Sequence, residues 1–437
     1  MAHAGPLDAA YARVTGERGE RVCKDIPEDA CRDVPWNFFL QLATSFASKL
    51  ADTLSDTKLV LTWLLTMIGA PAGAISALVP IREAGSLVPQ VAISGYLRRA
   101  RIRKGFWLLG CLVQGGSVGA VALLARLRPE PSTGWIVVGL IALFAVGRSV
   151  CSVSSKDLLG KTVPKTRRGR LGGLASSAAG GITLFVGLAI ALRGKESLSL
   201  SQLSIFLWVA AGSWLVSALL MGGLRELSSD VDPKSGGFGE TLRDFKVLAT
   251  DRDFRRFCIA RALLASTILS FPFYVVLAKE ATSGRVASLG IMLVATNSAT
   301  ALSGFAWGRL ADHSSRLTLS IAGIAAGAIG CVTFVVAGLG LGPTASLWTY
   351  GALFFLVGLA HTGIRLGRKT YVVDLATADT RSLYVAVGNT LIGGVLLVSG
   401  SFGALAPWIG ERGVILVFAL LGIAGGVLAW TLRDVES

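Results

Sequence analysis

The chain has 437 residues, of which 52% are hydrophobic and 16% charged, and its formal net charge is +15. A soluble domain cannot cover that much apolar surface, and the basic residues gather in alternate connections instead of forming the basic and aromatic stripe of a nucleic-acid-binding protein. We therefore take lipid as the solvent and α-helices as the spanning elements.

Apolar windows of about 18 to 25 residues, the length that crosses about 30 Å of hydrocarbon, recur along the whole chain. They predict an all-α membrane protein with twelve transmembrane helices. The first six spans are 38–69, 71–97, 104–126, 134–156, 170–192 and 202–224. The second six spans are 255–279, 284–308, 316–340, 347–371, 383–406 and 411–432.

One long charged connection divides these spans into six plus six. It is expected to be a linker that carries an amphipathic helix. The predicted units are an N-terminal segment at 1–37, a six-helix bundle at 38–224, the linker at 225–254, a second six-helix bundle at 255–432 and a tail at 433–437.

The distribution of Lys and Arg predicts the orientation in the cell membrane. These residues number five in 98–104, six in 156–170, two in 309–316 and four in 365–381, against seven in all the opposite loops. The positive-inside rule therefore places the linker and both termini in the cytoplasm. The first apolar window follows a charged stretch, so we expect the first span itself to direct insertion.

The cysteines indicate no metal site. Cys23 and Cys31 are separated by seven residues, a spacing that fits no zinc pattern, and a disulfide is not expected on a cytoplasmic face. The other four lie in apolar windows, where cysteine is a small packing residue: Cys111, Cys151, Cys258 and Cys331. No cofactor is expected.

The two halves repeat the same spacings. SGYLRRARIRK at 94–104 and WGRLADHSSRL at 307–317 align at three positions: Gly95, Leu97 and Arg103 against Gly308, Leu310 and Arg316. In the fourth and tenth spans, an arginine precedes an aspartate by nine residues: Arg148 with Asp157, and Arg365 with Asp374. Two related, pseudo-symmetric halves are the economical explanation.

At these residues the chain resembles the major facilitator superfamily of transporters. GRLADHSSRL at 308–317 is similar to that family's loop motif after the eighth span, and PKTRRGRLGG at 164–173 is similar to its pattern before the fifth span. The resemblance implies two six-helix bundles that rock about a central cavity. It also implies that Asp312 acts as a latch by accepting hydrogen bonds at a neighbouring helix start.

The first half departs from this motif, because Arg99 stands where the second half has Asp312. We therefore expect Asp157, Arg103 and the cluster Arg167–Arg170 to share charge in another arrangement. The residues predicted to control the conformation, here called the gate set, are Gly95, Arg103, Asp157, Arg168, Gly308, Asp312, Arg316 and Asp374.

The adjacent charges Arg82 and Glu83 are the leading site candidates. They lie about 16 to 18 Å from the start of the second span at 1.5 Å per residue, about halfway along it. An unpaired charge at that depth costs several kcal/mol, so both side chains should face the bundle interior or water. Pro80 and Pro89 bracket the pair and can kink the helix.

The first span supplies candidate partners for these charges. Lys49, Asp52, Asp56 and Lys58 fall within ten residues, and Asp52 and Asp56 are one helical turn apart on a shared face. The alternative is a surface-lying amphipathic helix at 37–54, with the first span starting at Lys58. We favour the long span, because the matching lengths of the second and eighth spans fix where the first must end.

Other polar residues lie at depth in the remaining spans: Arg148, Arg261, Asn297, His361, Arg365 and Asn389. A lone histidine in an apolar helix is more often a packing residue than a ligand. For Arg148 and Arg365, a structural pairing with Asp157 or Asp374 and a direct ligand contact both stay open. The predicted solute and ion pathway contains Arg82, Glu83, Asp52, Asp56, Lys58, Arg148, His361, Arg365, Asn297 and Asn389.

These features predict a secondary active transporter, not an enzyme, since there is no nucleotide-binding loop, helical His pair or serine elbow. The arginines at depth favour an anionic or zwitterionic solute. A carboxylate among Glu83, Asp52 and Asp56 that exchanges a proton would couple transport to protons. The alternatives are an exporter of hydrophobic compounds and a non-transporting receptor or assembly protein. The expected partners are the solute, protons and the bilayer, and the expected state is a monomer.

Overall fold

The computed structural model describes residues 6–15, 28–192, 199–228, 245–376, 381–399, 402 and 405–435. All secondary-structure elements within these ranges are helices. The N-terminal half contains α1 (Pro6–Thr15), α2 (Glu28–Cys31), α3 (Val34–Leu54), α4 (Val60–Met67), α5 (Ala72–Leu87), α6 (Gln90–Arg98), α7 (Lys104–Leu127), α8 (Thr133–Thr162), α9 (Lys165–Ala191) and α10 (Leu200–Gly222). The C-terminal half contains α12 (Val247–Thr250), α13 (Arg252–Leu264), α14 (Ser266–Leu269), α15 (Phe271–Ala281), α16 (Val286–His313), α17 (Ser315–Gly338), α18 (Pro343–Leu375), α19 (Arg381–Ser399) and α20 (Ala406–Trp430).

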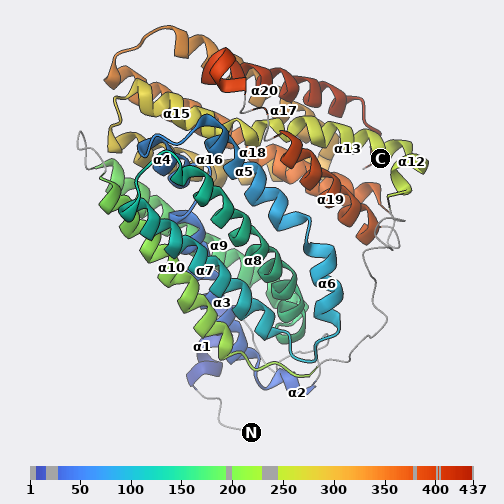
Figure 1. Cartoon of the computed structure of the whole chain (residues 1–437). Coiled ribbons are helices and arrows are strands. Elements are labelled where there is room, and N and C mark those ends of the chain that lie inside the picture. Colours follow the sequence, from blue (N-terminus) through green and yellow to red (C-terminus); the bar gives the residue numbers. More distant parts are fainter. Residues whose placement is uncertain are drawn as a thin grey trace.

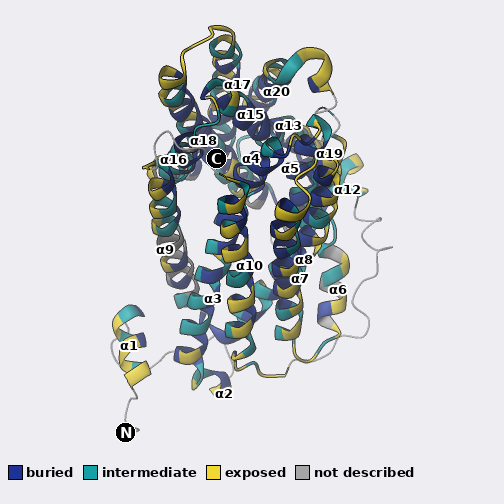
Figure 2. Ribbon diagram, turned by 60° about the vertical axis from the view of Figure 1, so that its left-hand side comes forward, coloured by how far each residue is buried: buried dark blue, intermediate teal, exposed yellow. Residues whose placement is uncertain are grey.

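Each predicted span coincides with one helix or with a run of consecutive helices, so the predicted all-α class is confirmed. By length and composition, seven helical segments of the described chain can cross a membrane: α7, α8, α10, the run α13–α15, α17, α18 and α20. Large apolar side chains face outward from these bundles, as Leu219 on α10 does at 78% exposure. Figure 2 shows such exposed positions along the outer faces of α7 and α10, where lipid would cover them.

The first span is interrupted between α3 and α4. Asp56 sits in the interruption, and its Oδ1 accepts hydrogen bonds from the backbone amides of Lys58 at 2.9 Å and Leu59 at 3.0 Å. These bonds satisfy two amides that would otherwise be free at the start of α4. Because α3 packs against α9 and α10 inside the bundle, its position favours the spanning prediction over the surface-lying one (Figure 2).

Two further spans are divided into shorter helices. The second span divides at Val88 and Pro89 into α5 and α6, whereas Pro80 lies inside α5 without ending it. The seventh span divides at Ala265 and Ser270 into α13, α14 and α15. The first span of each half is therefore discontinuous, as expected for related halves.

The two halves touch along one end of the molecule. There α4 contacts α15, α5 contacts α19 and α9 contacts α16, and Figure 1 shows α4 and α15 side by side at the upper left. Glycines permit this approach: a Cβ added to Gly290 would lie 2.3 Å from the amide nitrogen of Ala191, and one added to Gly393 would lie 2.7 Å from Val88. The backbones of α9 and α16 are thus so close that a side chain does not fit between them at Gly290.

The N-terminal segment is docked on the first bundle. Tyr11 of α1 is fully buried and its ring meets Phe38 of α3 edge-on at 5.3 Å. Arg167 donates a hydrogen bond to the carbonyl oxygen of Thr15 at 2.9 Å. Cys31 is disulfide-bonded, so the expectation of no disulfide in this segment is wrong. The cysteine bonded to Cys31 lies outside the described residues, as does Cys23.

The linker is described only in part, since 229–244 lies outside the described residues. Its described portion contains the single turn α12, and the amphipathic helix expected in the linker stays a prediction. Asp251 then caps α13 by accepting hydrogen bonds from the amide of Phe254 at 2.9 Å and from the hydroxyl of Tyr384. Burial opposes ionisation of this carboxyl group, but the two donors hold the pKa of Asp251 below its usual range.

The close α9–α16 contact predicts that one methyl group added at Gly290 destabilises the protein. Gly290→Ala places a Cβ against the backbone of α9 and should destabilise the protein by about 1 to 3 kcal/mol, which is typical of overpacking. Thermal unfolding of the purified protein in detergent measures this as a lower Tm. Gly304→Ala on the same helix is the matched control, because a Cβ there meets no atom within 4 Å. Equal melting temperatures for both variants would contradict the close contact.

Candidate functional site

A cavity of about 550 Å³ lies between the two halves. Its walls come from α5, α8, α13, α14, α17, α18 and α19, together with the start of α6, so both halves contribute. The polar and charged residues among its lining are Glu83, Gln90, Ser152, Lys156, Arg261, His361, Arg365, Arg368, Lys369 and Asn389. The only aromatic ring among the described lining residues is the imidazole of His361.

The described lining is strongly positive, since it has five Lys or Arg side chains against the single carboxylate of Glu83. Three of these cations, with His361, lie on α18: Arg365, Arg368 and Lys369. Their spacing from His361 is four, seven and eight residues, which places all of them on one face of the helix. The cavity is therefore a basic chamber in which α18 supplies most of the charge.

Arg82 and Glu83 point to different surroundings. Glu83 lines the cavity, and within the described chain no cation lies within 4 Å of its carboxylate. Arg82 is only 7% exposed and turns away from the cavity into the first bundle, where its guanidinium lies 5.8 Å from the ring centre of Phe144. The two adjacent charges thus serve separate environments, and neither is turned to lipid.

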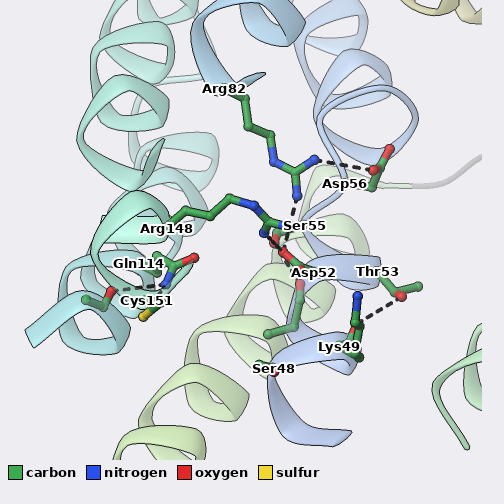
Figure 3. A network of polar contacts seen from close by, with 12 residues as sticks. Ser48, Lys49, Asp52, Thr53, Ser55, Asp56, Arg82, Gln114, Arg148 and Cys151 are labelled. Atoms are coloured by element: carbon green, nitrogen blue, oxygen red, sulfur yellow. Dashed lines mark hydrogen bonds and ion pairs between the residues drawn. The ribbon is translucent and has the colours of Figure 1, made fainter. Parts of the chain in front are cut away.

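Asp52 holds two arginines together (Figure 3). Its Oδ1 accepts a hydrogen bond from Arg82 Nη2 at 3.2 Å and a second from Arg148 Nη1. Asp56 adds a longer contact, 3.8 Å from its Oδ2 to Arg82 Nη1. Three helices, α3, α5 and α8, meet through this group, here called the arginine–aspartate network. Arg148 pairs with Asp52, so the suggested pairing of Arg148 with Asp157 is wrong.

The remaining predicted pathway residues divide between the cavity and its surroundings. Arg261 donates from Nη2 to Oδ1 of Asn389 at 2.8 Å, and both residues line the cavity. Lys58 does not line the cavity, and its ammonium group lies 5.5 Å from the ring centre of Phe271. Asn297 donates to the carbonyl oxygen of Leu293 in its own helix and does not line the cavity.

His361 faces the cavity from the middle of α18. Its ring meets Phe271 edge-on at 5.7 Å, and its Nδ1 is buried without a hydrogen-bond partner in the described chain. A buried polar atom without a partner is costly, so it marks a place where a ligand or water can bind.

Two residues of the gate set in the first half, Arg103 and Asp157, belong to an ion-pair network at the end with the basic loops. Arg103 pairs with Asp157, and Lys161 approaches the same carboxylate at 2.9 Å. Glu226 completes it: its carboxylate accepts hydrogen bonds from the backbone amides of Arg103 and Lys104 and lies 3.5 Å from Lys161. Arg103 and Asp157 thus share charge as expected, while the side chains of Arg168 and Arg170 lie outside the described residues, so the part of the Arg167–Arg170 cluster stays a prediction. Sequence reasoning missed Glu226, because it was assigned to the linker.

The gate set of the second half is described in part. Arg316 pairs with Asp434 at 2.9 Å and donates to the carbonyl oxygen of Leu432. Gly308 lies in α16, and Asp374 is exposed near the end of α18. The side chains of Arg168 and Asp312 and the surroundings of Gly95 lie outside the described residues.

The opposite end of the seam is closed by a contact between α4 and α15. Lys279 Nζ donates to Thr66 Oγ1 at 3.0 Å and lies 5.7 Å from the ring centre of Trp63. A second cavity of about 410 Å³ adjoins this contact and also carries Glu280 and Glu411. Sequence reasoning missed Lys279, because it placed this residue in a loop.

Sequence reasoning also missed three cations of the main cavity, Lys156, Arg368 and Lys369. The signal was present in α18, because His361, Arg365, Arg368 and Lys369 follow helical spacing on one face. In the sequence, Arg368 and Lys369 indicate only a cytoplasmic loop. Lys156 had no such signal, since its position on the cavity depends on how the halves pack.

Comparison with protein-family models gives no match, and comparison with curated proteins gives none either. Solved structures do match over most of the chain. A POT family transporter in complex with 5-aminolevulinic acid has a TM-score of 0.69 and 11% identity, covering 93% of this chain and 98% of that one. The nucleoside transporter NupG has a TM-score of 0.67 and 12% identity, covering 90% and 100%. A D-xylose-proton symporter has a TM-score of 0.63 and 13% identity, covering 92% and 98%.

The chain therefore has the fold of the major facilitator superfamily, the fold that its loop motifs predicted. It is a multi-pass membrane protein with a charged cavity at the seam of two helical bundles.

The arginine–aspartate network predicts a loss of stability when its shared carboxylate is neutralised. Asp52→Asn leaves Arg82 with only the longer contact to Asp56 and leaves Arg148 unpaired. Breaking a buried ion pair costs about 3 to 5 kcal/mol, and the smaller figure applies because Arg148 is partly screened by solvent. The Tm in detergent should fall by several degrees. Glu130→Gln, the same chemical change on an exposed loop, should leave the Tm unchanged. If Asp52→Asn has the same Tm as the unchanged protein, the structural role of Asp52 is overturned.

Proposed function

We propose that this chain is a secondary active transporter that carries a small anionic or zwitterionic solute across the cell membrane by alternating access, with protons as the coupling ion. The observation that carries this proposal is the cavity between the two halves, which contains Glu83 and a set of cations. Such a position, at the interface of related bundles, is where transporters of this architecture bind solutes. The solute, protons and the bilayer are its partners, and a monomer suffices.

The open and closed ends of the seam support an inward-facing state. The cavity reaches Lys156 and Lys369 near the basic loops, which the positive-inside rule assigns to the cytoplasm together with both termini. At the other end Lys279 and Thr66 join α15 to α4. Opening this contact while the basic ends approach each other would expose the same cavity to the outside.

The chemistry of the cavity favours a charged solute over a hydrophobic one. An exporter of hydrophobic compounds needs apolar and aromatic contact surface, whereas this lining presents five cationic side chains and one carboxylate. Those charges can hold carboxylate or phosphate oxygens through charge-assisted hydrogen bonds. An assembly protein has no comparable use for a charged cavity between the halves, whereas a receptor could bind a ligand there and is distinguished by the transport assay.

Glu83 is the proposed site of proton coupling. Asp52 is fixed as an anion by Arg82 and Arg148, and Asp56 is engaged by two backbone amides, so these carboxylates already have structural partners. Glu83 has no ion pair among the described residues and lies on the cavity wall. A proton bound there changes the net charge of the cavity and so shifts the balance between the inward- and outward-facing states.

Transport by the purified chain in liposomes tests the proposed function. A charged solute should accumulate against its own gradient when a proton gradient is imposed. Accumulation should stop when an ionophore removes the proton gradient. Binding of solutes without any transport, with or without the gradient, would instead identify a receptor.

Replacing Glu83 tests the coupling role separately. Glu83→Gln should abolish accumulation driven by the proton gradient, because the amide cannot bind and release a proton, while exchange of solute across the membrane continues. The Tm should stay near that of the unchanged protein, since Glu83 has no ion-pair partner to lose. Glu130→Gln is the control and should transport normally. Gradient-driven accumulation in Glu83→Gln would remove this residue from the role.

A further inference from the structure

We infer that the solute of this cavity is a small organic dianion, a molecule with two carboxylate groups or a phosphate ester, and not a zwitterion. This inference rests on the proposed transport function and narrows it to one substrate class. Its basis is the positive charge of the cavity that the protein itself leaves uncompensated.

The cations of the cavity are not neutralised by the chain. Among the described residues, no carboxylate lies within 4 Å of Lys156, Arg365, Arg368 or Lys369, and none of them has an ion pair elsewhere. The contrast with Arg82 and Arg148, which share Asp52, shows that this chain pairs its structural arginines. Unpaired cations beside a cavity are therefore available to a ligand.

The binding groups are partly fixed before a ligand arrives. Arg261 is 8% exposed, its Nη2 is held by Asn389 at 2.8 Å, and its Nε is buried without a partner. Nδ1 of His361 is likewise buried and unpartnered. A guanidinium that is immobilised in advance loses little entropy when it binds, so Arg261 is prepared for an oxygen acceptor.

The positive face of α18 is longer than a single carboxylate or phosphate group. His361 and Lys369 are separated by about 12 Å along the helix at 1.5 Å per residue, and Arg365 and Arg368 lie between them. Arginine presents parallel N–H donors that match carboxylate and phosphate oxygens in pairs. Two anionic groups of one small molecule can therefore be held at once.

The charge balance favours a dianion over a zwitterion. The ammonium group of a zwitterion has one carboxylate to meet, Glu83, and its carboxylate neutralises only one of the cations. A dianion offsets two of them without adding a positive charge. Lys156 comes from the first half and the α18 cations from the second, so closing the basic ends brings like charges together unless an anion lies between them.

Binding measurements on the purified full chain in detergent test this inference. The probes are succinate and ribose 5-phosphate as the two kinds of dianion, dialanine as the zwitterion and xylose as the neutral solute, each assayed at low ionic strength by thermal shift and by calorimetry. Succinate or ribose 5-phosphate should raise the Tm and bind at least about tenfold more tightly than dialanine. The ranking of the two dianions separates carboxylate from phosphate recognition.

Variants of α18 locate the binding. Arg365→Gln and Arg368→Gln should each weaken dianion binding by about tenfold or more, the loss expected for a charge-assisted hydrogen bond. Their unliganded Tm should not fall, because neither side chain has an ion pair to lose. Arg126→Gln, an exposed arginine at the other end of the molecule, is the matched control and should bind normally.

The outcomes distinguish this inference from the transport function. Equal or tighter binding of dialanine, no shift with either dianion, or unchanged affinity in both α18 variants would overturn the inference. Transport of a zwitterion in liposomes would overturn it while leaving the transport function intact. Tight dianion binding without transport would leave the inference standing and overturn the transport function.

Discussion

The cost of placing a charge away from water constrains the whole structure. A charged side chain inside a bundle must find an opposite charge, a hydrogen-bond donor or a wet cavity, because lipid offers none of these. Asp52 meets that requirement by joining Arg82 and Arg148, and in doing so it ties α3 to α5 and α8. Glu226 does the same at the basic end, where it binds backbone amides of Arg103 and Lys104.

The same constraint separates charges that are paired inside a bundle from charges that face the cavity. Paired residues such as Arg82 hold helices together and are nearly buried, while Glu83, Arg365 and Arg368 face the cavity and have no ion pair with any residue that the structure describes. Adjacent residues on a helix project about 100° apart, so Arg82 and Glu83 reach different neighbours although they follow each other in the chain. Two opposite charges side by side in the sequence therefore have different surroundings: Arg82 pairs inside the first bundle, and Glu83 lines the cavity.

The interrupted first span connects these parts. Asp56 satisfies the free amides at the start of α4, which permits the helix to stop and restart at the depth of the network. Lys58 follows directly and reaches toward Phe271 of the other half. A continuous helix would leave no irregular backbone here, and non-helical backbone within a bundle is tolerated only where protein or a cavity surrounds it.

The sequence by itself determined the spans, their division into two related halves and the fold, because apolar length, basic loops and the motif at 308–317 are local properties of the chain. It also indicated Arg82, Glu83, His361 and Arg365 as polar groups at depth. The tertiary structure decided which charges pair, since the partner of Arg148 is Asp52, almost a hundred residues away, and not the nearby Asp157. It alone could reveal Lys156 as a wall residue, because a cavity between two bundles is formed by helices that have no contact along the sequence.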